Sequence, residues 1–280
     1  MKLIIETKSP LSHGAFGGND LGNYMMFRRI NLVNVPGTPQ IPVISGNAIR
    51  GTLRRLIMTD LYNKAGMTFE TYASTCGIDN NTKIKRNWDR LWAALYNGGT
   101  IETPDKSINP ENLRELRKQI VPLSLFGSAL YSIMLNGMVT VGFAYPYCKE
   151  TIQAGIFEDK GQALSANNLL EDIGLTRHID RENADPDNTG VKPMPYEVET
   201  LATGTILKAD ITFLPMATPI ERSCMAYSIE LLNSLGGKTS IGFGKLTAKT
   251  VEQTENSELY KEWLDMAPLL DNLINLAATL

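Results

Sequence analysis

Recurring apolar positions divide the chain into strands and helices. Residues 2–7 are apolar and β-branched and predict a strand at the start of the chain. A helix is predicted to begin after Ser45, a suitable N-cap, and to end before Gly66, because apolar residues recur every four positions between them. Further elements are predicted in the order strand, strand, helix, strand, at residues 138–145, 203–215, 219–234 and 245–251.

This order of elements predicts an α+β fold with a ferredoxin-like (RRM-like) βαββαβ core interrupted by insertions. Tryptophans at 88 and 92 and a helix start at Asn109-Pro110 indicate that one insertion is mostly helical. Pro268 is expected to kink or split the last helix. The expected parts are a core at 1–66, 121–150 and 201–250, a helical insertion at 67–120, an irregular polar excursion at 151–200, and an acidic helical tail at 251–280.

Composition excludes several classes of protein. The chain has 280 residues, 43% of them hydrophobic, which is enough for a full core. No apolar run approaches the roughly 20 residues that cross a bilayer, and Glu6 interrupts any leader-like segment, so we expect a soluble, cytoplasmic protein without membrane contact. Three scattered cysteines and two histidines predict no disulfide framework, no metal site and no cofactor.

The net charge of −3 conceals a strong asymmetry along the chain. Residues 251–280 carry six carboxylates and Lys261 as their only basic residue, whereas residues 21–59 contain no Asp or Glu. Five arginines fall in that acid-free stretch: Arg28, Arg29, Arg50, Arg54 and Arg55. A basic patch on a nearly neutral protein indicates a phosphate-bearing partner held at one surface.

The predicted helix after Ser45 supplies the first candidate site. A start of Ser-Gly-Asn leaves free backbone N–H groups at the positive end of the helix, which suits a phosphate. Arg50 and Arg54 lie one turn apart on one face, so both guanidinium groups could follow a sugar–phosphate chain. The alternative is an ordinary solvated basic face. The acid-free flanks favour phosphate binding.

A glycine-rich loop at 234–246 supplies the second candidate site. Its GGKTS string is not a nucleotide-binding P-loop, because Leu232 stands where that motif needs glycine and the loop joins a helix to a strand. Backbone N–H groups of such a turn can still cradle phosphates, with Lys238 adding charge. The alternative is a tight turn that needs positive φ angles.

Taken in order, these pieces resemble the RAMP superfamily of CRISPR proteins, and most closely the repeated backbone subunit of type III and type IV effector complexes. The resemblance rests on a glycine-rich loop near residues 13–22, IPVISGNAIRGTLRR at 41–55, the Leu-Phe-Gly-Ser element at 125–128, Ile179-Asp180-Arg181 with the returning Glu199-Thr200, and LGGKTSIGFGKL at 235–246. Residues 67–120 and the acidic tail match no part of that pattern.

The resemblance implies a subunit that oligomerises along a guide (CRISPR) RNA with other effector subunits and supports its pairing with a target strand of RNA or DNA. A ferredoxin-like palm would grip the guide, and a thumb hairpin at 177–200 would place Met194 and Tyr196 between bases; the alternative is that these two side chains anchor the loop to its own core. The candidate RNA-binding residues are His13, Arg28, Arg29, Ser45, Asn47, Arg50, Arg54, Arg55, Arg177, Arg181, Gly236, Gly237, Lys238, Thr239 and Lys245.

One departure from the family pattern bears on catalysis. In target-cleaving type III subunits an aspartate precedes the basic helix, and by spacing its place here falls near Ile30; the nearest carboxylate is Asp20. We therefore expect a subunit that binds without cutting. One alternative is that the glycine-rich loop near residues 13–22 folds back and brings Asp20 to the place of the family aspartate. Another alternative is a metal-independent RAMP endoribonuclease with His13 as general base. A third reading is an α+β domain whose arginines bind another polyanion.

Overall fold

A computed structural model of the chain describes all residues except 16–23, 101–108, 131–132, 178–193, 252–255 and 280. An antiparallel sheet lies at its centre, with four strands in the order β13-β1-β12-β8 and β9 also paired with β12. Its strands are β1 (Lys2–Thr7), β8 (Val139–Val141), β9 (Tyr145–Pro146), β12 (Ile206–Phe213) and β13 (Leu246–Val251). Helix α1 (Gly46–Ala65) follows β1 along the chain, and α7 (Pro219–Glu230) follows β12.

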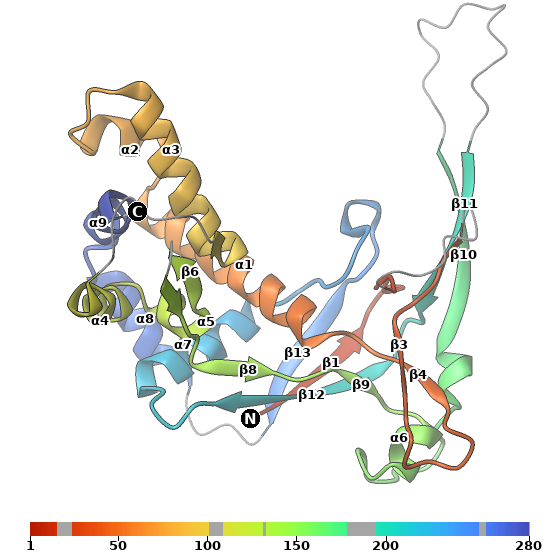
Figure 1. Ribbon diagram of the computed structural model, residues 1–280. Coiled ribbons are helices and arrows are strands. Elements are labelled where there is room, and N and C mark those ends of the chain that lie inside the picture. Colours follow the sequence, from red (N-terminus) through yellow and green to blue (C-terminus); the bar gives the residue numbers. More distant parts are fainter. Residues whose placement is uncertain (16–23, 101–108, 131–132, 178–193, 252–255, 280) are drawn as a thin grey trace, which may run out of the picture.

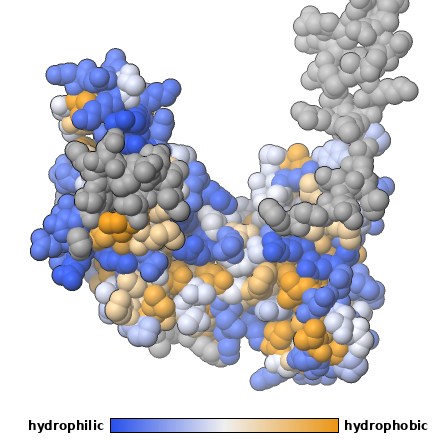
Figure 2. Space-filling view, viewed as in Figure 1, coloured by the Kyte–Doolittle hydropathy of each residue, from blue (hydrophilic) through white to orange (hydrophobic). Residues whose placement is uncertain are grey.

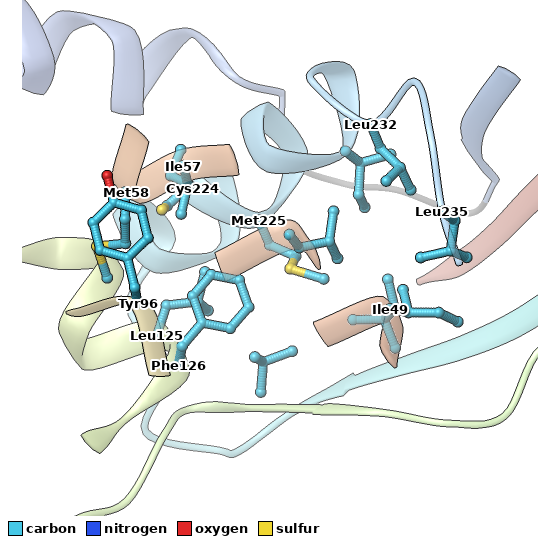
Figure 3. Packing of buried hydrophobic residues seen from close by; sticks show 14 of the residues in the cluster. Ile49, Ile57, Met58, Tyr96, Leu125, Phe126, Cys224, Met225, Leu232 and Leu235 are labelled. Atoms are coloured by element: carbon cyan, nitrogen blue, oxygen red, sulfur yellow. The ribbon is translucent and has the colours of Figure 1, made fainter. Parts of the chain in front are cut away.

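One face of this sheet is buried beneath the two helices. Alternate residues of β1 and β12 are buried, and the register pairs Leu3 with Ala209 on that face. Helix α1 contacts β8, α7 contacts β13, and the two helices contact each other. Ile49 of α1 and Met225 of α7 lie in the resulting core (Figure 3). This alternation of buried and exposed positions follows from the single buried face of the sheet.

A helical region covers one end of the molecule (Figure 1). Its described elements are α2 (Phe69–Thr75), α3 (Asn81–Trp92), the π-helix η1 (Ala93–Asn97), α4 (Pro110–Gln119) and α5 (Val121–Phe126). A small sheet, β5 (Gly99–Thr100), β6 (Ser128–Leu130) and β7 (Ile133–Leu135), lies beside them. Of the segment 121–150 that we assigned to the central core, only β8 and β9 belong to the main sheet, because β6 and β7 pair with β5 instead.

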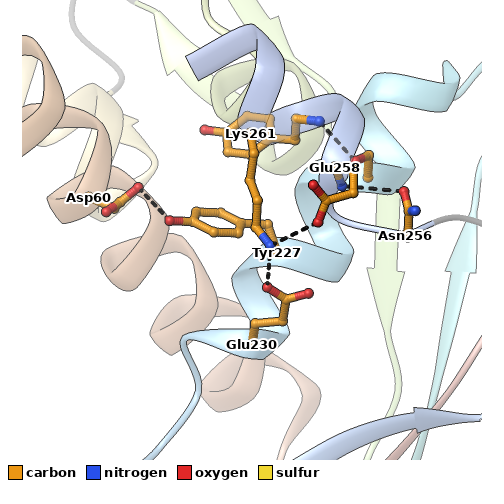
Figure 4. Close-up of polar contacts among 8 residues, drawn as sticks. Asp60, Tyr227, Glu230, Asn256, Glu258 and Lys261 are labelled. Atoms are coloured by element: carbon orange, nitrogen blue, oxygen red, sulfur yellow. Dashed lines mark hydrogen bonds and ion pairs between the residues drawn. The ribbon is translucent and has the colours of Figure 1, made fainter. Parts of the chain in front are cut away.

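The acidic tail folds back on its own chain. Helix α8 (Glu258–Met266) packs on α7, and α9 (Leu269–Thr279) contacts α1, α3 and α4. Pro268 separates the two helices, as predicted. Lys261 forms ion pairs with Glu230 and Glu258, each at 3.2 Å, and the Tyr227 hydroxyl donates to Asp60 at 3.2 Å (Figure 4). These contacts hold α8 on α7 and α7 on α1.

A long hairpin rises from the other end of the sheet (Figure 1). It consists of β10 (Leu170–Arg177) and β11 (Met194–Leu201), which pair in antiparallel register, and β2 (Tyr24–Met25) joins β11 in parallel. Nearby lie the β3–β4 pair (Arg29–Asn31, Gln40–Pro42), α6 (Lys149–Gln153) and the 3-10 turns η2 (Ala166–Leu169) and η3 (Thr239–Ile241). The excursion at 151–200, expected to be irregular, therefore contains two eight-residue strands.

No helix in the described part of the chain is long and apolar enough to span a membrane. No group of three or more His, Cys, Asp or Glu residues suited to a metal ion occurs among those same residues.

Candidate nucleic-acid interface

The first turn of α1 is capped as the sequence predicts. Ser45 is the N-cap, and its Oγ accepts a hydrogen bond from the Ala48 N–H at 3.3 Å. Asn47 is exposed on this turn, which contains no acidic residue. At Gly46 the helix approaches β8 so closely that a Cβ atom would lie 2.0 Å from the Val141 carbonyl oxygen. Only glycine fits there, and it fixes where the positive end of the helix points.

His13 holds this helix start from outside the helix. Its Nε2 accepts a hydrogen bond from the Ser45 backbone N–H at 3.2 Å, and its carbonyl accepts from the Arg28 N–H at 2.8 Å. Partial burial, followed by the charge of Arg28, lowers the pKa of His13 below its usual 6.5. The imidazole is therefore neutral and acts as an acceptor near pH 7. The ring nitrogen that a general base would use is already occupied by the backbone.

The three arginines of α1 have three different environments. Arg50 is half-buried and donates to the carbonyl oxygen of Phe126. Arg54 is 5% exposed and donates to the same oxygen at 2.7 Å and to the Gly127 carbonyl. Arg55 is exposed and donates to its neighbour Thr52. Arg50 and Arg54 thus share a face, as predicted, but that face points toward the end of α5.

Arg54 therefore serves the fold, and its contact with a phosphate stays a prediction. Its guanidinium caps the last carbonyl groups of α5, where a cation is favoured. Burial, and secondarily the charge of Arg50, lower its pKa to about 10, so it remains charged at neutral pH. A side chain so enclosed presents little surface to a partner. Arg50 is the member of the pair that still reaches solvent.

The Leu-Phe-Gly-Ser element at 125–128 supplies the acceptors for this pair. Gly127 has a φ of 66°, and a Cβ there would lie 2.3 Å from the Leu135 carbonyl oxygen, so this turn requires glycine. The Ser128 hydroxyl donates to the Ala94 carbonyl at 2.8 Å and ties the turn to η1. The element thus positions the two arginines.

The acid-free stretch at 21–59 does not give an acid-free surface. Arg29 forms an ion pair with Glu199 of β11, whose other oxygen accepts from the Phe27 N–H at 2.7 Å. Arg28 lies over the Phe143 ring at 6.0 Å. The charge of Arg29 is thus neutralised by a carboxylate distant in sequence, which a local count of charge cannot reveal, and its contact with a phosphate stays a prediction.

The glycine-rich loop packs on the first residues after β1. Gly236 has a φ of 89°, and a Cβ there would lie 2.3 Å from the Ser12 carbonyl oxygen. The Gly237 N–H donates to that oxygen at 2.8 Å. Thr239 and Lys245 are exposed. Ser12 and its neighbour His13 therefore tie the loop and the start of α1 together. Sequence reasoning missed Ser12, because it acts through its main chain.

Lys238 connects the same loop to the hairpin. Its ammonium lies 4.4 Å from the centre of the Tyr196 ring and 3.4 Å from the Tyr196 hydroxyl. Tyr196 is half-buried by this contact, which favours the anchoring role over the base-wedge role. Met194 and Arg177 belong to the hairpin strands, but their side chains, like all of Asp20 and Arg181, lie outside the described residues.

These elements border one hollow. Figure 2 shows the molecule hollowed between its helical region and its hairpin. The start of α1, the glycine-rich loop and the base of the hairpin are joined there through Ser12, His13 and Lys238. Asn47, Arg50 and Lys238 are thereby held in one region by backbone contacts. The arrangement offers backbone N–H groups and cations from several elements to a single extended anion.

Comparison with known proteins defines the fold class. No known protein family and no curated protein matches the sequence. Among solved structures, a chain of a type IV-B CRISPR complex superposes with a TM-score of 0.58 at 18% identity, covering 90% of both chains. Chains of the type III-B Cmr-beta complex bound to cognate target RNA and of Thermofilum pendens Csc2 have TM-scores of 0.42 and 0.41 at 14% and 15% identity. The match to the Cmr-beta chain covers 90% of this chain and 58% of that one. The match to Csc2 covers 98% of this chain and 79% of that one.

The chain therefore has the fold of a subunit of a type IV-B CRISPR complex. This likeness in fold agrees with the resemblance to type IV complex subunits that the sequence motifs predict.

Proposed function

We propose that this protein is an RNA-binding backbone subunit of a multisubunit CRISPR effector complex, in which copies line up along a guide RNA. The observation that carries the proposal is the joining of the α1 start and the glycine-rich loop through Ser12 and His13. This contact joins two backbone segments of a kind that suits anions, on a fold similar to that of a type IV-B CRISPR complex chain, and so supports the proposal. The target strand, RNA or DNA, would pair with the guide on its open side.

The central sheet serves as the palm in this proposal. Its strand order β13-β1-β12-β8, with α1 and α7 as the crossovers, is the one that a ferredoxin-like βαββαβ unit requires. Because β1 and β13 are antiparallel neighbours with Thr7 opposite Leu246, the segment that leaves β1 and the glycine-rich loop that enters β13 lie at the same end of the sheet. The hairpin β10–β11 serves as the thumb.

Arg50 is the arginine best placed to bind a phosphate. Its guanidinium is held by the Phe126 carbonyl, and no carboxylate in the described part of the chain forms an ion pair with it. Burial lowers the pKa of Arg50, which means that the charged form lacks full solvation. An approaching phosphate would supply the missing counter-charge. Arg54 behind it adds positive potential without touching the ligand.

We further propose that the subunit binds the target without cutting it. By spacing, the place of the aspartate that target-cleaving type III subunits carry falls near Ile30, which lies in β3 opposite Ile41 and packs against the core. An apolar side chain offers no group for general acid–base chemistry. His13 is engaged with Ser45, which does not favour the endoribonuclease alternative.

Arg50→Ala tests the RNA site directly. We expect guide-RNA affinity to fall about tenfold for every guide sequence, and the slope of log affinity against log salt to decrease by about one, because one phosphate contact is lost. Arg114→Ala is the matched control: Arg114 is an exposed arginine on α4, away from the hollow. Equal RNA affinity of the parent, Arg50→Ala and Arg114→Ala would contradict the proposed site.

Co-expression with a CRISPR array tests the function as a whole. The purified protein should then carry RNA, seen as a raised 260/280 nm absorbance ratio, and elute as a particle of several copies. Protein that stays RNA-free and monomeric in the presence of the array would overturn the proposed function.

A further inference from the structure

A groove runs between helices α4 and α8. Two hollows of about 980 Å³ and about 600 Å³ share Lys118, Ile220 and Trp263 in their linings, so they form one continuous groove. Helices α4 and α8 form its walls, and α5 and the first turn of α7 form its floor. Figure 1 shows α4 and α8 at the end of the molecule opposite the hairpin. The groove is therefore separate from the hollow proposed to hold RNA.

The polar groups in the floor of this groove bind one another. Arg117 donates to the Ser124 hydroxyl at 3.1 Å, and that hydroxyl donates to the carboxylate of Glu221. The other oxygen of Glu221 accepts from the backbone N–H and the hydroxyl of Thr218, at 2.7 Å and 2.9 Å. Ser124 and Glu221 are buried. Because these groups already have partners, the floor does not require a polar ligand.

What the groove offers to a partner is apolar surface. Met216 lines one hollow and Met266 the other, and these side chains are 73% and 79% exposed. Ile220 and Trp263, which line both hollows, are half-buried between them. Exposed apolar side chains gathered in one place mark an interaction site. Methionine is suited to such a site because its flexible side chain adapts to the surface that packs on it.

The shape of the groove favours a helix as its occupant. Both walls are helices, and none of the described residues that line the groove belongs to a strand, so an extended peptide would find no sheet edge to pair with. A groove of this kind takes the apolar face of an amphipathic helix. Helix α4 has 10 residues and is about 15 Å long, so a helix of about three turns matches the length of its wall.

The two walls of the groove differ in charge. The lining residues of α4 have an excess of positive charge, namely Arg114, Arg117 and Lys118 against Glu111 and Glu115. The one charged lining residue of α8 in the described part of the chain is Glu262. Lys118 is paired with Glu115 at 2.8 Å, whereas Arg114 and Glu262 are exposed and form no ion pair with any described residue. A complementary partner therefore places carboxylates beside α4 and cations beside α8.

We propose that this groove binds an amphipathic helix of about three turns from a different protein. Its apolar face packs on Ile220 and Trp263, its acidic edge lies along α4 and its basic edge along α8. The described helices α1, α3, α4, α7, α8 and α9 all pack apolar side chains into the core of their own chain, so a second copy has no free amphipathic helix to offer. Both walls belong to the segments 67–120 and 251–280, which match no part of the family pattern. The inference does not depend on RNA binding.

A designed peptide tests the groove. The probe is a fluorescein-labelled amphipathic helix of about three turns with leucines on one face, glutamates along one edge and lysines along the other. A scrambled peptide of the same composition, which has no continuous apolar face, is its control. Fluorescence anisotropy should show saturable binding of the probe to the unaltered protein, at least about tenfold tighter than binding of the scrambled peptide.

Met216→Glu tests the apolar contact. A carboxylate in the groove would be buried beneath the apolar face of the probe, so affinity should fall at least about tenfold. Met134→Glu is the matched control, because Met134 is 66% exposed on β7 and lies outside the lining of the groove. It should bind the probe as the unaltered protein does. Both variants should keep the unfolding temperature of the unaltered protein, since both side chains are exposed.

Arg114→Glu tests the charge of the walls. The unaltered protein should prefer the probe to a peptide with lysines along both edges by about threefold, because its walls have opposite charges. In Arg114→Glu both walls are acidic, so the preference should change to the peptide with two lysine edges. This comparison does not depend on the direction in which the peptide lies.

Four outcomes would overturn the inference. They are equal binding of the probe and the scrambled peptide, equal binding of the probe by the unaltered protein and Met216→Glu, an equal loss in Met134→Glu, and an unchanged peptide preference in Arg114→Glu. Weaker binding of guide RNA or smaller assemblies in Met216→Glu would overturn it too, because RNA or a second copy would then occupy the groove. Failure of the unaltered protein to bind RNA would count against the proposed function alone.

Discussion

Helices α1 and α3 carry similar clusters of basic residues but use them in opposite ways. In α1, Arg50 and Arg54 turn onto the carbonyl groups that end α5, and Arg54 is buried. In α3, Lys83, Lys85 and Arg86 are exposed. The difference comes from what packs beside each helix: a row of free carbonyl oxygens draws guanidinium groups inward. The density of positive charge in a sequence therefore does not tell which cations remain available to a partner.

The largest expected effect is on stability, at Arg54. Replacing it by alanine leaves the Phe126 and Gly127 carbonyls without their buried donor, so the free energy of unfolding should fall by about 3 kcal/mol. Arg55→Ala, one residue further along α1, should change it by less than about 0.5 kcal/mol, because Arg55 is exposed. Urea denaturation measures both. Equal effects of the two substitutions would show that buried Arg54 contributes no more to stability than exposed Arg55.

The next largest effect concerns how closely α1 approaches the sheet. In Gly46→Ala the new methyl group would meet the Val141 carbonyl oxygen, so we expect a loss of about 2 kcal/mol. Gly51→Ala, on the same helix, meets only the flexible end of Arg55 at 3.5 Å and should gain about 0.5 kcal/mol from helix propensity. Thermal unfolding of the two variants should therefore shift in opposite directions; shifts of the same sign would contradict this geometry.

The smallest expected effect is a pH dependence at His13. Its pKa is lower in the folded protein than the usual 6.5, so the unfolded chain binds the proton more tightly. The stability due to neutral His13 is complete above pH 6.5 and declines as the pH falls below that value. In His13→Gln, whose amide oxygen can still accept from Ser45, stability should decline less steeply between pH 7 and pH 5, because glutamine does not take up a proton. Identical pH profiles for the two proteins would show that His13 does not hold the helix start.

Local signals in the sequence predicted much of the fold. Strand β1 and helix α1, with Ser45 and Gly66 as its caps, occur where expected, because each is specified by residues close to one another in the chain. Helix α4 begins at the predicted Asn109-Pro110 start. The hairpin was expected only from the family resemblance, since the polar composition of residues 151–200 by itself predicted an irregular segment. Strand β10 lacks a strict alternation, because Glu171 and Asp172 are adjacent and Gly174 lies between Ile173 and Leu175.

The candidate site was predictable in composition but not in detail. The cap at Ser45 and the glycines of the loop could be identified, since they depend on local backbone geometry. The burial of Arg54 and the pairing of Arg29 with Glu199 could not, since both partners come from distant segments. The Gly127-Ser128 pair indicates a turn, and it is the local signal that points to the carbonyl groups accepting from the arginines of α1.

Helix α9 has a consequence for anyone who shortens this chain. It covers apolar side chains of α1, α3 and α4 with Leu273 and Leu276, both fully buried. A version ending after β13 would expose these apolar side chains to solvent. Some of them belong to α1, whose first turn is proposed to bind the guide RNA. The acidic C-terminal segment therefore stabilises the packed helices, and a chain without it is expected to aggregate.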